Sequence, residues 1–137
     1  MAGTNAAIGG GGFHHVALKA KDFDRSVRFY TQALGFRKKL CWGEGDGRAV
    51  MLDVGDGGCL EIFAGGQGGE AEGVLLHFAL RTADCAAALE RARAAGAQVT
   101  MEPQAVEVPS RPPITVHIAF CKGPDGEVIE FFQSRDI

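Results

Sequence analysis

Apolar residues recur along the chain with two different spacings, and the two spacings follow one another in the same order twice. Alternation of apolar and polar positions is typical of half-buried strands, and spacings of three and four residues are typical of amphipathic helices. The alternation predicts strands over residues 13–20, 36–42, 48–54 and 58–64, and again over 74–82, 98–108, 114–121 and 127–133. The helical spacing predicts helices over 23–34 and 85–95. Each half of the chain therefore has the predicted order βαβββ.

The two predicted helices have the same start and stop signals. Asp22 and Asp84 precede them at the capping position, where a carboxylate accepts a hydrogen bond from the first helical turn. Gly35 and Gly96 follow them, and glycine is favoured there because it adopts positive φ. The two aspartates are 62 residues apart in the sequence. The shared signals indicate an internal repeat.

The polar residues inside the strands show the same repeat. His15 and His77, on the first strand of each half, are 62 residues apart, and Glu61 and Glu130, on the last strand, are 69 apart. A duplication followed by an insertion in the second half explains both offsets. The resulting division is a flexible tail over 1–12, a first module over 13–64, a glycine-rich linker over 65–73 and a second module over 74–133, together one domain over 13–137.

The composition is that of a globular protein. The chain has 137 residues, of which 46% are hydrophobic and 23% charged, and this excludes a disordered or coiled-coil protein. A net charge of −3 gives no field that would attract nucleic acid or anionic lipid. No apolar run approaches the roughly 18 residues of a membrane span. We expect neither a nucleic acid nor a membrane as partner.

The four cysteines are scattered, with no CxxC pair and no secretory signal before them. This pattern predicts reduced thiols that pack as small hydrophobic side chains, and a cytoplasmic protein.

The histidines and glutamates of the repeat are candidates for a metal site. Because strand side chains alternate, all four face away from the predicted helices: His15, Glu61, His77 and Glu130. Burying a carboxylate without a partner is costly, and two imidazoles with two carboxylates suit one divalent ion, Zn, Ni, Co, Mn or Fe(II). The alternatives are ordinary hydrogen-bonded or solvated strand residues, or His–Glu ion pairs that remain from a decayed metal site.

Other polar residues are candidates for substrate contacts. His117 is predicted to face the same side as the four candidate ligands, together with Cys121, either as a substrate contact or as a hydrogen-bonded core residue. The side chains of Arg48, Arg81 and Arg111 are candidates for binding an anionic substrate.

The motifs that carry these residues resemble the vicinal oxygen chelate superfamily, which includes glyoxalase I (lactoylglutathione lyase), extradiol dioxygenases, methylmalonyl-CoA epimerase and antibiotic-resistance proteins. The resemblance covers about residues 13–133. It rests on His15-Val-Ala-Leu, Ser26-Val-Arg-Phe-Tyr30, His77-Phe-Ala-Leu, Gly123-Pro-Asp-Gly126 and Val128-Ile-Glu130. The resemblance implies an α+β fold in which two tandem βαβββ modules form a cupped, incomplete barrel with the metal on its concave floor.

The resemblance also implies roles for the candidate residues. His15, Glu61, His77 and Glu130 stand at the four ligand positions of glyoxalase I, with one divalent metal per site. Glu130 stands where that enzyme class has its proton-moving base, and the presence of Glu61 favours lyase or isomerase chemistry, so both are catalytic candidates. Lys19 occupies the position of an arginine that holds the glutathione carboxylate, so it is a candidate substrate contact.

The function implied is a metal-dependent lyase or isomerase that acts on a small substrate with vicinal oxygens through an enediolate, in a homodimer. Two alternatives stay open: a non-catalytic binding protein of the same fold for a small molecule such as an antibiotic, and an Fe(II) extradiol-type dioxygenase.

Overall fold

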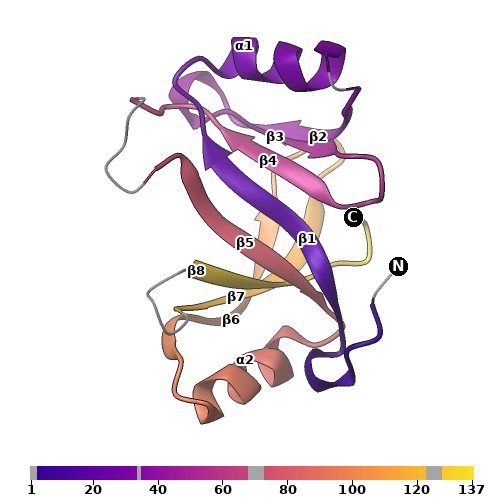
Figure 1. Ribbon diagram of the computed structural model, residues 1–137, viewed down its shortest axis with the longest axis vertical. Helices are drawn as coiled ribbons and strands as arrows, with labels where there is room; N and C mark the ends of the chain where they lie inside the picture. The colour runs from indigo at the N-terminus through magenta and orange to yellow at the C-terminus, as the bar shows by residue number, and fades with distance from the viewer. Residues whose placement is uncertain (1–2, 34, 68–72, 123–127) are drawn as a thin grey trace. The chain divides into compact units, whose positions relative to one another are not determined.

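Helices and strands follow one another in the predicted order in both halves of the computed structural model, which describes residues 3–33, 35–67, 73–122 and 128–137 (Figure 1). The first half contains β1 (Gly10–Lys19), α1 (Phe23–Arg28), a π-helical turn (Phe29–Ala33), β2 (Arg37–Trp42), β3 (Ala49–Asp53) and β4 (Cys59–Phe63). The second contains β5 (Leu75–Thr82), α2 (Cys85–Ala94), β6 (Gln98–Val108), β7 (Ile114–Lys122) and β8 (Val128–Gln133). Two short 3-10 turns complete the regular structure of the described residues, at Ala6–Ile8 and Gly45–Gly47. The predicted α+β class is confirmed.

The elements group into two units, and the four strands of each half are consecutive neighbours in the sheet. The first unit comprises His15–Leu76 with Pro109–Pro113, and the second comprises Met1–His14, His77–Val108 and Ile114–Ile137. The strand order is β2-β3-β4-β1 in the first and β6-β7-β8-β5 in the second. In each, the first and last strands of the half pair in parallel, and the other neighbours pair antiparallel. The predicted duplication is thus present in the topology.

Both helices begin where the sequence predicts, and α2 ends within one residue of its predicted end, whereas α1 ends at Arg28 and the predicted helix continues as the π-helical turn to Ala33. Asp22 accepts a hydrogen bond of 3.0 Å from the backbone N–H of Arg25, and Asp84 accepts one of 3.0 Å from Ala87. Gly35 follows the first helical segment with a φ of 76°. Among the described residues, no helix is both long and apolar enough to cross a membrane.

Each helix covers one face of the strands of its own half (Figure 1). Val27 of α1 packs with Val50, Leu52 and Ile62 of the first unit. Leu89 of α2 occupies the corresponding place in the second unit, where it packs with Ala119, Cys121 and Phe131. The face of each sheet that points away from its helix carries the candidate ligands.

Residues 5–12, which the sequence assigns to a flexible tail, have regular structure. Asn5 caps the turn Ala6–Ile8, the side chain of Ile8 packs against the core under α2, and β1 already begins at Gly10. A run of glycines is typical of a flexible segment. Here Gly9 ends the turn Ala6–Ile8 with a positive φ, a conformation that glycine adopts without steric cost. Partial burial of Ile8 against this core stabilises the segment, which its composition does not reveal.

Parts of several predictions lie outside the described residues. They are the N-terminal end of the tail (1–2), the last predicted residue of the first helix (34), the middle of the linker (68–72), and the motif at 123–126 with the first predicted residue of the last strand (127).

We expect the core under α2 to contribute strongly to stability. Leu89 is fully buried, so Leu89→Ala should lower the free energy of unfolding by about 2–5 kcal/mol through lost apolar contacts and a residual cavity. Urea unfolding followed by circular dichroism would measure the loss. Arg91→Ala, at an exposed position of the same helix, is the control and should change the value by about 0.5 kcal/mol or less. An equal decrease in the free energy of unfolding in both variants would contradict the packing of Leu89 in the core under α2.

Candidate functional site

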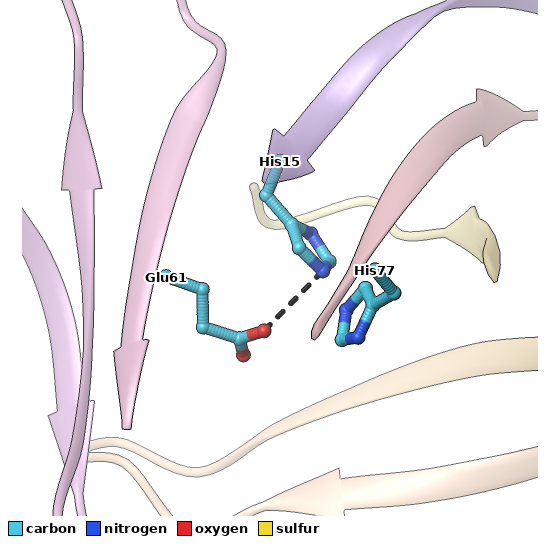
Figure 2. A group of neighbouring side chains, drawn as sticks. All are labelled: His15, Glu61 and His77. Carbon is cyan, nitrogen blue, oxygen red and sulfur yellow. Dashed lines mark ion pairs between the residues drawn. The ribbon is translucent and has the colours of Figure 1, made fainter. Parts of the chain in front are cut away.

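The first candidate pair lies on β1 and β4 of the first unit. These strands pair in parallel with Ala17 opposite Glu61, and His15 shares a face with Ala17 because it is two residues away. The Nε2 atom of His15 lies 3.3 Å from Oε1 of Glu61, and the two side chains are 1% and 8% exposed. Figure 2 shows the imidazole and the carboxylate pointing toward one another, and it also labels His77, the histidine of the second pair.

The second pair lies on β5 and β8 of the second unit and repeats this geometry. Ala79 lies opposite Glu130 in a parallel ladder, and His77 is two residues before Ala79. The Nε2 atom of His77 lies 3.2 Å from Oε2 of Glu130, with the side chains 13% and 7% exposed. The structure therefore pairs each predicted histidine with the predicted glutamate of its own half.

An alanine makes each pair possible. Ala17 and Ala79 stand beside the histidine on its own strand and opposite the glutamate, and both are fully buried. Because alanine has no side-chain atom beyond Cβ, the glutamate can lean across it toward the imidazole. The sequence signal for this arrangement is the repeated His-x-Ala, at His15 and at His77.

Apolar neighbours surround the carboxylates. Met51 on β3 lies opposite Glu61, and Phe120 on β7 lies opposite Glu130. The ring of Phe120 also meets the ring of His77 edge-on, with 5.5 Å between centroids. In such surroundings an ion pair gains Coulomb energy but loses hydration, so it is a weak source of stability. The lost hydration of these carboxylates is explained if the pairs bind a metal ion.

The spacing within each pair fits two ligands of one metal ion. Nitrogen and oxygen ligands lie about 2.1 Å from a divalent transition metal, so two of them at angles between octahedral and tetrahedral values are about 3.0–3.4 Å apart. The observed separations of 3.3 and 3.2 Å lie within this range. Imidazole with carboxylate is also a donor set that Zn, Ni, Co, Mn and Fe(II) accept.

The prediction that His117 and Cys121 face the candidate ligands is wrong. Cys121 is buried in the core under α2, and His117, four residues earlier on the same side of β7, is exposed. Phe120, on the other face of β7, lies beside His77 and opposite Glu130 instead. Apolar residues occur on both faces of the strand, with Ile118 and Phe120 on one and Ala119 and Cys121 on the other, so the sequence does not show which face the helix covers.

The other predicted contact residues have different environments. Lys19 is exposed at the end of β1. Arg81 is half-buried, and its Nη1 donates a hydrogen bond to the carbonyl oxygen of Phe13. Its side chain therefore stabilises the main chain of β1. Arg48 and Arg111 line a separate cleft of the first unit.

The cysteines depart from the prediction at one position. Cys59, Cys85 and Cys121 are buried as expected, whereas Cys41 is exposed, and all four are free thiols. Burial raises the pKa of Cys85 and of Cys121.

The sequence is similar to that of curated bacterial proteins over most of its length. It is 34% identical over 131 residues to a protein of Vibrio cholerae named "Probable lactoylglutathione lyase", with 88% of this chain and 89% of the relative covered. It is 34% identical over 135 residues to the lactoylglutathione lyase of Haemophilus influenzae, with 88% of this chain and 91% of the relative covered.

The fold is similar to that of solved structures. The methylmalonyl-CoA epimerase of Mycobacterium tuberculosis matches with a TM-score of 0.71 at 20% identity, over 90% of this chain and 87% of that one. The family model described as Glyoxalase/Bleomycin resistance protein/Dioxygenase superfamily matches residues 12–131, which include all four candidate ligands and all but the last residues of the two βαβββ modules. On these grounds the chain belongs to the glyoxalase, bleomycin resistance protein and dioxygenase superfamily.

Proposed function

We propose that the protein is a divalent-metal-dependent lyase or isomerase of the glyoxalase type, acting on a small substrate with vicinal oxygens. The observation that carries the proposal is the duplicated, buried His–Glu pair, whose two members have the spacing of ligands on one ion. The similarity to proteins named lactoylglutathione lyase supports the same reaction class.

We infer that the two pairs act together on one ion. His15, Glu61, His77 and Glu130 would supply four ligands, which leaves two positions of an octahedral ion for water or substrate. When bound, such an ion acts as a Lewis acid that stabilises negative charge developing on a substrate oxygen.

The carboxylates provide the proton chemistry. In the proposed reaction an Oε atom of Glu130 takes a proton from one substrate carbon and returns it to the neighbouring carbon, while the hydroxyl proton moves from the oxygen on the first carbon to the oxygen on the second, so the net change is an isomerisation. The carboxylate of Glu61 supplies the negative charge of the first pair, and its contact with Nε2 orients the imidazole of His15. Met51 and Phe120 keep water away from the carboxylates, so the transferred proton is retained.

Metal content and turnover of the hemithioacetal of methylglyoxal and glutathione test the function. We expect about one divalent ion per chain. Glu130→Ala should lose most of this ion and lower kcat/KM at least about 100-fold, because it removes both a ligand and the base. His117→Ala, on the other face of β7, should leave both values unchanged.

The same measurements distinguish the alternatives. Failure to take up Zn, Ni, Co, Mn or Fe(II) would overturn the proposal and favour a binding protein. Iron with oxygen consumption would favour a dioxygenase. Metal uptake with turnover of a 2-methyl-branched CoA thioester, but not of the hemithioacetal, would retain the isomerase and exclude glutathione as cosubstrate.

A larger residue at Ala17 should disrupt the first pair. Ala17→Val places two methyl groups where Glu61 leans toward His15, so we expect metal affinity to fall at least about tenfold. Metal titration followed by calorimetry measures this. Ala105→Val, at an exposed strand position, should have no effect, and thermal melting shows whether each variant is folded. Unchanged affinity in folded Ala17→Val would contradict the role given to this alanine.

We also propose a homodimer. Val74, Leu75 and Leu76 at the start of β5 are exposed apolar side chains, and Leu75 is 63% exposed. Sedimentation velocity should give twice the chain mass of 14.4 kDa, and Leu75→Lys should shift the protein toward the monomer. A monomeric wild-type protein at micromolar concentration would refute the dimer.

A further inference from the structure

A cleft of about 730 Å³ opens on the helix side of the first unit, away from the His15–Glu61 pair. It lies between α1, the edge strand β2 and the segment Pro109–Pro113, and its lining includes Val27 and Val50 of the core under α1. Its volume is within the range of sites for small organic ligands, roughly 300–1,000 Å³.

The charge of this cleft opposes the charge of the chain. Four basic side chains line it, Lys38, Lys39, Arg48 and Arg111, against two acidic ones, Asp24 and Glu44. The lining therefore has a net charge of +2 in a chain whose net charge is −3. Because a concave surface focuses the field of its charges, the cleft favours anions.

One of the two acidic groups is already engaged. Nη1 of Arg48 lies 3.0 Å from Oδ1 of Asp24, and Nε of Arg48 donates a hydrogen bond of 2.9 Å to the carbonyl of Gly45. The guanidinium also lies 4.6 Å from the centre of the Phe23 ring. Arg48 is thus held in place from three sides, and the two lysines and Arg111 supply the excess positive charge.

The backbone brings the remaining cations to one place. Successive strand residues normally face opposite sides, but the pairing of β2 with β3 shifts register between Lys38 and Leu40. Such an irregularity redirects a side chain, and both Lys38 and Lys39 line the cleft. Arg111 arrives from the connection between β6 and β7, which packs with the first unit.

The cleft also has an aromatic part. Phe23 and Trp42 lie in its lining, so a ligand can place an apolar ring beside its charged group. We propose that this cleft is a second binding site, for a small organic anion that carries a phosphate or carboxylate group on an apolar body. The site is independent of the proposed metal.

Cys41 offers a direct readout of occupancy. It lines the cleft and is exposed, whereas the other three cysteines are buried. Alkylation by iodoacetamide, followed by mass spectrometry of the peptide with Cys41, therefore reports on the cleft. We expect saturating phenyl phosphate to slow this alkylation at least about fivefold, and inorganic phosphate at equal concentration to slow it less, because it lacks the apolar ring.

Removing two cations tests the recognition. The double variant Lys39→Ala/Arg111→Ala should raise the phenyl phosphate concentration for half-maximal protection at least about tenfold, the factor that one charge-assisted hydrogen bond is worth. Lys122→Ala/Arg135→Ala removes the same charge from exposed positions outside the cleft and should leave the protection unchanged.

Absence of protection, or equal loss of protection in both double variants, would overturn the proposal. Glu130→Ala should retain full protection of Cys41. This separates failure of the anion site from failure of the proposed metal-dependent function.

Discussion

The parallel pairing of the first and last strand in each half is the contact on which the site depends. It sets an alanine opposite a glutamate and a histidine two residues away, and this register brings imidazole and carboxylate to within 3.3 Å in one half and 3.2 Å in the other. A shift of one residue would turn the glutamate to the helix side, into an apolar core. The helices enforce the register, because their apolar stripes need the alternate residues of the same strands.

Burial of the four ligand candidates is a cost that the rest of each unit offsets. The carboxylates lie beside Met51 and Phe120, where hydration is lost. The stability that permits this comes from the cores under α1 and α2, on the opposite face of each sheet. The fold thus places the stabilising cores on one face of its strands and the candidate ligands on the other.

Because the candidate ligands of the first unit lie on one face of its strands, the other face has room for the second binding site proposed above. Helix α1 does not fully cover the helix side of β2. The cleft lies at this uncovered part of the strand and is lined by basic side chains and aromatic rings. Register irregularity in an edge strand is tolerated there because no further strand has to match it. A change in this cleft therefore need not disturb the pair on the other face.

The sequence by itself determined the order of elements, the helix caps and the duplication, because these depend on local signals: side-chain alternation, Asp22 and Asp84 before the helices, and glycines after them. It also made His15, Glu61, His77 and Glu130 candidate ligands, since two constant offsets place them on equivalent strands.

Tertiary structure decided what has no local signal. The face of His117 depends on which side of β7 the helix covers, and an apolar run does not encode this. The order of residues 5–12 depends on a place for Ile8 in a core formed by residues far along the chain. The convergence of Arg48, Lys39 and Arg111 depends on a strand irregularity and on where a distant connection packs, so only the folded chain reveals that cleft.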